Sequence, residues 1–353
     1  MRIVKTMRPE DFIIGGGPAS AAAPAGGAVV SRGRSLTIVI PILNEGRGIT
    51  ALERRLTLVL DRLTCPWDVV FVDDGSTDAT LAELKALNAR DPRFTAISFS
   101  RNFGKEIAVA AGLRHAKGEG VVIMDGDLQH PPETIIEFVR AWDQGYEVVY
   151  GTRRDRDTDG PVRRFLSGAF YGLFKFFSGT ELPRGAGDFR LLDRKAVAAL
   201  NAMGERARFN KGLYAWIGFK SVGVPFDVEA RRDGASRWKL RRLLSFAVDA
   251  FASFTTIPLR VWSYVGLLIS GMAFLYVIGF LAKTLIYGVD VPGFPTQIIA
   301  IMILGGVQLI SLGVIGEYLA RIYEEVKGRP LYVVAERIGA SEVGSASPDI
   351  PKS

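Results

Sequence analysis

Two aspartates one residue apart, Asp125 and Asp127, follow a short apolar run at residues 121–124. Such a run is typical of a buried strand, and side chains that alternate along an extended chain place both carboxylates on the same side. Two like charges this close repel each other unless a cation lies between them. Because Mg²⁺ and Mn²⁺ prefer hard oxygen ligands and usually share them with phosphates, the pair predicts a metal site for a phosphate-bearing substrate.

The N-terminal half repeats an apolar run followed by a helix-like stretch. Strands are expected at residues 36–40, 67–72, 94–99, 121–124 and 147–150, and helices at about 46–63, 78–90, 104–117 and 132–144. This alternation predicts an α/β fold with a mostly parallel, doubly wound, Rossmann-like sheet. Such sheets bind ligands at the carboxyl ends of their strands.

Polar residues gather at those carboxyl ends. They are Asn44 and Glu45, Asp73 and Asp74, Arg101 and Asn102, and Asp125 and Asp127. Because parallel strands end at one edge of a sheet, we expect these side chains to form a single site. Residues 76–78, Ser-Thr-Asp, are also expected to cap the helix that follows.

Three motifs in this order resemble glycosyltransferase family 2, whose fold is called GT-A. They are Pro41-Ile-Leu-Asn-Glu45, Val72-Asp-Asp-Gly-Ser-Thr-Asp78 and Asp125-Gly-Asp-Leu-Gln-His-Pro-Pro-Glu133. The resemblance continues through Gly187-Asp-Phe-Arg190 and Arg208-Phe-Asn-Lys-Gly-Leu213 and covers about residues 35–330. Within the family, the chain most resembles polyprenyl-phosphate glycosyltransferases: bactoprenol glucosyltransferases, their aminoarabinose-transferring relatives and dolichyl-phosphate mannose synthases.

The resemblance implies an inverting transfer from a nucleotide sugar, most readily a UDP-sugar, to a polyprenyl phosphate, which in a bacterium is undecaprenyl phosphate. The residues assigned to donor binding are Pro41, Asn44, Glu45, Asp73, Asp74, Lys105, Asp125, Arg190, Arg208 and Lys211. Among these, Asp73 or Asp74 would accept hydrogen bonds from the nucleobase. The sugar stays open: glucose is the first expectation, and galactose, an N-acetylated amino sugar, a modified arabinose and mannose are the alternatives.

The catalytic group is expected to be Asp125, Asp127 and Asp188. Asp125 and Asp127, with Gln129 as a further ligand, would hold Mg²⁺ or Mn²⁺ on the leaving diphosphate. Asp188 follows a glycine-rich turn and is placed near the sugar. The acceptor phosphate is already an anion near neutral pH, with a second pKa of about 6, so a strong general base is not required. His130 is interpreted as a turn residue or a ligand.

The acceptor phosphate is expected to meet arginines, which bind phosphate through bidentate hydrogen bonds. The resemblance assigns Arg153, Arg163 and Ser167 to this contact. An equally open interpretation of Arg163 and Arg164 is a basic surface that faces the membrane.

Two charge-free windows, residues 261–282 and 296–316, are each long enough to span a bilayer, which takes about 20 apolar residues. A short connector joins them, so a transmembrane hairpin is expected, with helices at about 261–283 and 295–318. The lysines and arginines before and after the hairpin place both chain ends in the cytoplasm. The resemblance to bactoprenol glucosyltransferases implies that this membrane is a bacterial inner membrane.

The remaining organisation follows from these boundaries. We expect a flexible tail at 1–34, a cytoplasmic GT-A domain at 35–235, an amphipathic juxtamembrane helix at 236–260, the hairpin at 261–320 and a cytoplasmic tail at 321–353. The net charge of +7 suits anionic lipid better than nucleic acid, because no nucleic-acid-binding motif accompanies it. A single cysteine excludes an intrachain disulfide. The resemblance implies a homotetramer.

Two other functions are compatible with a membrane-bound GT-A domain. A processive polysaccharide synthase would carry a Gln-x-x-Arg-Trp motif. This chain has Arg237-Trp238, but Gly234 occupies the position of the glutamine. Two membrane spans are also few for a polymer channel. A catalytically inactive scaffold is the second alternative. The intact Asp125 and Asp127 argue against it.

Overall fold

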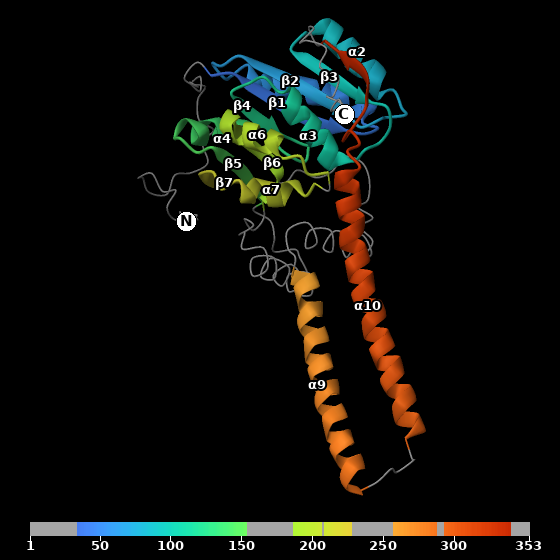
Figure 1. Ribbon diagram of the computed structural model, residues 1–353. Helices are drawn as coiled ribbons and strands as arrows, with labels where there is room; N and C mark the ends of the chain where they lie inside the picture. The colour runs from blue at the N-terminus through green and yellow to red at the C-terminus, as the bar shows by residue number, and fades with distance from the viewer. Residues whose placement is uncertain (1–33, 154–185, 207, 228–256, 288–292, 340–353) are drawn as a thin grey trace. The chain divides into compact units, whose positions relative to one another are not determined.

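The computed structural model describes residues 34–153, 186–206, 208–227, 257–287 and 293–339 (Figure 1). These residues divide into two compact units. One unit holds a mixed β-sheet with its helices, and it includes the chain from Pro330 onward. The other unit holds two long helices within Leu240–Arg329. The expected tail at 1–34, apart from Arg34, and the expected juxtamembrane helix up to residue 256 lie outside the described residues.

The sheet of the first unit has eight strands in the described residues, in the order β7-β5-β6-β4-β1-β2-β3-β8. Parallel pairing joins β3, β2, β1 and β4, and β7 pairs in parallel with β5. β6 is antiparallel to both β4 and β5, and β8 is antiparallel to β3. The strands are β1 (Leu36–Ile42), β2 (Trp67–Asp73), β3 (Phe94–Phe99), β4 (Gly120–Ile123), β5 (Val148–Arg153), β6 (Ala186–Asp193), β7 (Ser221–Phe226) and β8 (Val334–Ile338).

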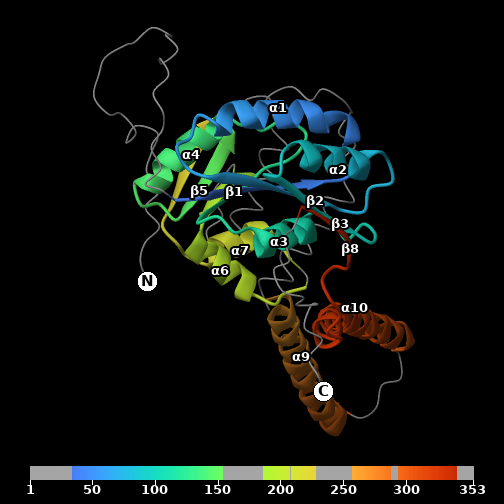
Figure 2. The ribbon, with the colours of Figure 1, turned by 90° about the horizontal axis from the view of Figure 1, so that it is seen from above.

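Helices cover both faces of this sheet, which confirms the predicted α/β fold. Figure 2 shows α1, α2 and α4 on one face and α3, α6 and α7 on the other. The central strands read as unbroken apolar runs because both of their faces are buried, and every residue of β1 is buried. The helices are α1 (Ile49–Leu60), α2 (Thr80–Arg90), α3 (Lys105–His115), α4 (Thr134–Asp143), α6 (Arg194–Ala202) and α7 (Asn210–Trp216).

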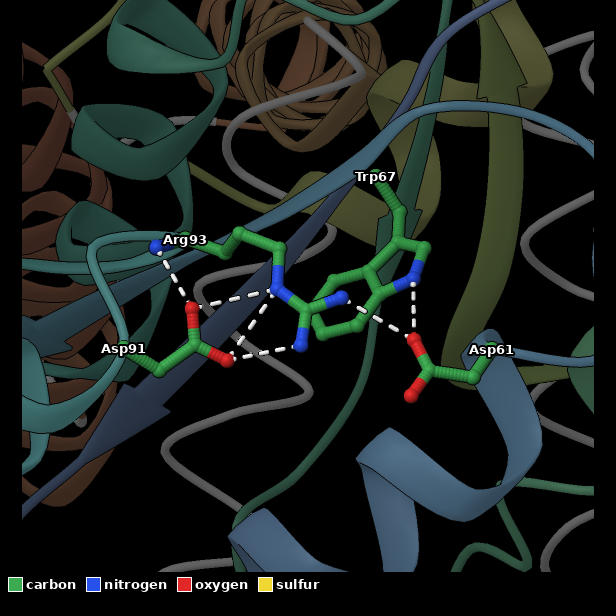
Figure 3. Close-up of polar contacts among 4 residues, drawn as sticks. All are labelled: Asp61, Trp67, Asp91 and Arg93. Carbon is green, nitrogen blue, oxygen red and sulfur yellow. Dashed lines mark hydrogen bonds and ion pairs between the residues drawn. The ribbon is translucent and has the colours of Figure 1, made fainter.

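A polar clamp joins the elements at the amino edge of the sheet (Figure 3). The Arg93 guanidinium lies 3.8 Å from the centre of the Trp67 ring and donates to Asp61 Oδ1 at 2.9 Å and to Asp91 Oδ2 at 2.7 Å. The Trp67 indole N–H also donates to Asp61 Oδ1, at 3.2 Å. These contacts tie the ends of α1 and α2 to the starts of β2 and β3.

The chain after the last helix, within the expected tail at 321–353, returns to the sheet. Residues 334–338 form the edge strand β8 on β3, and Lys85 Nζ lies 2.7 Å from Glu336 Oε1. Tyr332 stacks on Phe99 with ring centres 4.9 Å apart. β8 covers the backbone edge of β3, which would otherwise stay unpaired. A five-residue strand with two strongly apolar side chains carries too weak a pattern to be predicted alone.

The second unit contains α9 (Ile257–Tyr287) and α10 (Phe294–Val326). Both expected spans lie inside these helices, and α10 runs further than predicted. Large apolar side chains on both helices are exposed, among them Phe274 and Leu309. Within the described residues, Ile303–Val326 is a helical stretch long and apolar enough to cross a membrane.

Gly112 on α3 tests the packing of this helix against the sheet. A Cβ atom at Gly112 would overlap the Cγ1 methyl of Val39 on β1. Alanine improves helix propensity by about 1 kcal/mol, but overpacking a buried contact costs about 1–3 kcal/mol. We therefore expect Gly112→Ala to lower the Tm of the full-length protein in detergent by several degrees. Gly204→Ala, which meets nothing within 4 Å, is the control. An unchanged or higher Tm for Gly112→Ala would contradict this packing.

Candidate active site

The loops after β1 and β2 are joined to each other at the carboxyl edge of the sheet. The Asn44 backbone N–H donates to Ser76 Oγ at 2.8 Å, and Thr77 N–H donates back to Asn44 Oδ1 at 2.9 Å. Glu45 N–H donates to Thr80 Oγ1 at 3.1 Å. Asn44 has a φ of 56°, a conformation that asparagine tolerates better than most residues. Asn44 and Glu45 are exposed at this edge, whereas Pro41 is buried within β1.

Asp73 and Asp74 are buried and hydrogen-bonded inside the protein. Asp73 accepts from Ser76 N–H at 3.0 Å and from Ser98 Oγ at 2.7 Å. Asp74 accepts from the backbone N–H groups of Phe103 at 2.7 Å and Gly104 at 2.9 Å. Burial raises the pKa of Asp74. Both carboxylates therefore brace the edge, and their predicted contact with a nucleobase stays a prediction.

The sequence predicted that residues 76–78 cap the helix after β2, but the N-cap position is Ala79, one residue later. α2 begins at Thr80 with Ala79 at its N-cap, and no side chain caps it there. Asp78 instead accepts from the Thr80 backbone N–H at 3.0 Å and from Gly46 N–H at 3.4 Å. Asp78 thus helps to hold the loops after β1 and β2 together.

An ion-pair cluster forms where β4, β6 and α3 meet. Lys105, the first residue of α3, lies with its Nζ 2.6 Å from Asp125 Oδ1 and 2.9 Å from Asp188 Oδ2. β6 runs antiparallel to β4 with Arg190 opposite Ile123, which brings Asp188 beside the end of β4. Asp125 and Asp188 thereby share one ammonium group, although they are 63 positions apart in the chain.

The charges in this cluster hold one another in the ionised state. Burial alone would lower the pKa of Lys105, but Asp188 and Asp125 outweigh it, and the pKa is raised. Burial alone would raise the pKa of Asp188, but the charges of Lys105 and Lys211 lower it to about 2. Asp188 is therefore ionised at neutral pH.

The buried side chain of His130 supports the turn that carries Asp125 and Asp127. The His130 side chain is 4% exposed, and its Nδ1 accepts from the Asp125 backbone N–H at 3.3 Å. The ring stacks on Phe189 with ring centres 4.9 Å apart. Burial lowers the pKa of His130, so the ring is neutral with its proton on Nε2. Of the two interpretations of His130, the structure supports the turn residue.

The same turn offers the donors for a metal. Asp127 Oδ1 accepts from the Gln129 backbone N–H at 3.1 Å, and Leu128 between them has a φ of 57°. No group of three or more His, Cys, Asp or Glu residues among the described residues could hold a metal alone. Two carboxylates with hard oxygen donors fit Mg²⁺ or Mn²⁺, which complete their coordination with substrate phosphates and water.

Arg190 is a buried brace under the turn that presents Asp188. Its guanidinium lies 3.6 Å from the centre of the Tyr214 ring and donates to the Gly187 carbonyl at 2.5 Å. Among the described residues, neither Arg190 Nε nor the Tyr214 hydroxyl has a hydrogen-bond partner, although both are buried. Burial lowers the pKa of Arg190 and raises that of Tyr214. The predicted contact of Arg190 with the donor stays a prediction.

Arg208 and Lys211 flank the start of α7 and have different surroundings. Arg208 donates to the carbonyls of Met203 at 2.8 Å and Leu200 at 3.2 Å, which places it at the carboxyl end of α6. Cations at that end of a helix satisfy its last carbonyls. Lys211 is half-buried, and its charge acts on Asp188. Donor binding by either residue stays a prediction.

Glu106 and Asn210 belong to the site, and the sequence alone did not point to them. Asn210 N–H donates to Glu106 Oε2 at 3.1 Å, and Asn210 Nδ2 donates to the Glu106 carbonyl at 3.1 Å. The pair fixes the start of α7 to the start of α3. Burial, with the charge of Asp188, raises the pKa of Glu106 to about 7. The available signals were the position of Glu106 beside Lys105 and of Asn210 beside Lys211.

Of the three residues predicted to contact the acceptor, the structure describes Arg153. It is the last residue of β5 and is exposed, and its charge reaches His130. Arg163 and Ser167 lie outside the described residues, as does Arg164.

Comparisons with known proteins cover nearly the whole of the described chain. Residues 37–200 match the model of glycosyl transferase family 2, and residues 257–322 match the model described as the GtrB C-terminal hairpin. An uncharacterised glycosyltransferase of Synechocystis sp. is 46% identical over 86% of this chain and 96% of its own length. The prophage-derived bactoprenol glucosyl transferase of Shigella flexneri is 39% identical over 85% of this chain and 97% of its own length. The bactoprenol glucosyl transferase of Shigella phage SfV is 38% identical over the same shares.

The raised pKa of Glu106 predicts a pH-dependent effect on stability. In the folded chain its carboxyl keeps a proton up to about pH 7, whereas in the unfolded chain it ionises near pH 4.5. As pH rises between these values the unfolded state loses a proton that the folded state retains, so this group makes the folded state less stable. We therefore expect the Tm of Glu106→Gln, relative to wild type, to increase from pH 5 to pH 7.5.

Thermal unfolding of the full-length protein in detergent measures this difference. Glu83→Gln on α2, outside the cluster, is the control and should show no such trend. A Tm difference for Glu106→Gln that stays constant with pH would contradict the burial of this carboxyl.

Proposed function

Because the chain belongs to glycosyl transferase family 2, we propose that it moves a sugar from a nucleotide sugar to the phosphate of a membrane polyprenyl phosphate. The observation that carries this proposal is the cluster of Lys105, Asp125 and Asp188 beside Asp127, at the carboxyl edge of the sheet. The cluster places carboxylate oxygens and the Lys105 ammonium at the edge where α/β sheets bind their ligands.

The donor would lie over the loops after β1, β2 and β4. Asp125 and Asp127, with Gln129, would hold Mg²⁺ or Mn²⁺ on the diphosphate. When bound, the metal neutralises the negative charge that develops on the leaving group. Asn44 and Glu45 are exposed at the same edge and would border the nucleotide. A UDP-sugar is the donor we propose.

The chain's own residues would orient the reactants rather than remove a proton. The acceptor phosphate is already an anion at neutral pH, so it can attack the sugar without a general base. Asp188, with a pKa lowered to about 2, is too weak a base for that task and suits a hydrogen-bond acceptor from sugar hydroxyls. One attack opposite the leaving diphosphate inverts the configuration at the sugar carbon.

The exposed apolar helices of the second unit support a lipid acceptor. α9 and α10 carry large apolar side chains that stay exposed in the described residues, as expected of helices that face lipid. Arg153 at the end of β5 would contact the acceptor phosphate, with Arg163 and Ser167. Lysines and arginines on both sides of the hairpin favour an orientation with the catalytic domain in the cytoplasm. The bacterial relatives favour a bacterial inner membrane. We also propose a homotetramer.

Glucose and undecaprenyl phosphate are the substrates that the named relatives favour. The proteins of Shigella flexneri and Shigella phage SfV are named as bactoprenol glucosyl transferases, and each aligns with 85% of this chain. An inactive scaffold is disfavoured by the intact cluster of Asp125, Asp188 and Lys105. A processive synthase is disfavoured because these relatives are named for transferring glucose to bactoprenol, a lipid.

Replacing Asp127 tests the proposed chemistry. Transfer from labelled UDP- and GDP-sugars into organic-extractable lipid would be measured with full-length protein, undecaprenyl phosphate and Mn²⁺. We expect glucose from UDP-glucose to enter the lipid and Asp127→Asn to lower the rate roughly 10²–10³-fold. A metal on the leaving group contributes several kcal/mol, and about 1.4 kcal/mol corresponds to a tenfold change in rate.

Asp61→Asn is the matched control, because Asp61 lies in the clamp at the opposite edge of the sheet. Its rate should stay near that of wild type. Labelled polymer in place of labelled lipid would identify a synthase, and absence of both product and donor binding would identify a scaffold.

A further inference from the structure

The backbone of Lys105 is fixed, whereas its charged end has room to move. The two residues before it, Phe103 and Gly104, donate their backbone N–H groups to the buried Asp74. Gly104 has a φ of 101°, which sets the sharp entry into α3. The Lys105 side chain is 44% exposed, and lysine has a flexible four-carbon stem. The ammonium can therefore change partners while α3 stays in place.

The ammonium occupies the position that a metal would claim. It lies 2.6 Å from Asp125 Oδ1, and a bound Mg²⁺ would approach that carboxylate to about 2.0–2.1 Å. Two cations on the same carboxylate repel each other strongly in a partly buried site. A divalent metal on Asp125 would therefore weaken the ion pair between this carboxylate and Lys105.

A second anion is available to keep the lysine nearby after that exchange. Asp188 belongs to β6, and its Oδ2 lies 2.9 Å from Lys105 Nζ. An ammonium has three donors, so it can keep Asp188 and turn a freed donor to a phosphate oxygen. The geometry thus provides a cation that leaves Asp125 without leaving the site.

We propose that Lys105 is the built-in counter-ion of the donor-free site, and that the metal and the donor diphosphate together displace it from Asp125. In the donor-bound state Lys105 keeps its ion pair with Asp188 and donates to the diphosphate. The metal and the nucleotide then favour each other's binding, because each removes an obstacle to the other. This inference rests on the proposed function, in which a metal–diphosphate enters this site.

Mn²⁺ binding to the full-length protein in detergent, measured by the loss of the free-ion electron paramagnetic resonance signal, tests this role without turnover. In the absence of nucleotide, Lys105→Met should bind Mn²⁺ about tenfold more tightly than wild type, within the usual range of coupling between sites. Lys105→Arg keeps the charge and should bind Mn²⁺ as weakly as wild type. With UDP present, Mn²⁺ affinity should rise more in wild type than in Lys105→Met.

Lys211→Met separates displacement from a general effect of charge. Lys211 also acts on Asp188, so its loss should tighten Mn²⁺ binding less than the loss of Lys105. Equal effects of the two methionine variants, or no tightening in Lys105→Met, would overturn the proposal. If Lys105→Met has a lowered Tm, the Mn²⁺ affinities of wild type, Lys105→Arg and Lys211→Met are compared with and without UDP. A Mn²⁺ affinity of Lys105→Arg that differs from wild type would then overturn the proposal. Lipid-linked sugar formed by wild type is assayed in the same preparation, so failure of the proposed function is seen separately.

Discussion

Mutual repulsion among Asp125, Asp127 and Asp188 is the constraint on which the site depends. β6 enters the sheet antiparallel to β4 and sets Asp188 beside Asp125, where the two carboxylates would destabilise each other if left alone. Lys105 offsets part of that charge through two short ion pairs. The remaining negative charge makes the site receptive to a divalent cation. A cluster that is incomplete by itself is suited to a substrate that brings a metal with it.

Much of the surrounding structure holds these charges at fixed positions. Asp74 anchors the entry to α3, and His130 anchors the turn after β4. Glu106 and Asn210 join α3 to α7, and buried Arg190 supports the turn before Asp188. Each brace makes polar contacts inside the protein, so the fold itself organises this edge of the sheet. Preorganisation of this kind reduces the rearrangement that catalysis would otherwise require.

Local patterns were enough to predict the main strands, the helices between them and the hairpin, because apolar periodicity and turn residues are read within one segment. The turn after β4 that carries Asp125 and Asp127 was predictable for the same reason. The antiparallel insertion of β6 and the edge strand β8 depend on pairing between distant segments, which a single sequence does not display. Residue type also does not reveal a partner. Asp73, Asp74 and Arg208 have the chemistry of ligands, yet the structure gives them internal hydrogen bonds. The burial of His130 and the pairing of Glu106 with Asn210 could likewise not be predicted.

The central claim is a single displacement at the sugar by a lipid phosphate. The most direct measurement is the anomeric configuration of the product, determined by nuclear magnetic resonance after the full-length protein in a bilayer has reacted with UDP-glucose and undecaprenyl phosphate. The account predicts one glucose per lipid phosphate, in the β configuration, because the donor is α-linked and is attacked once. An α-linked product would contradict the account, and so would a sugar attached to anything other than the lipid phosphate.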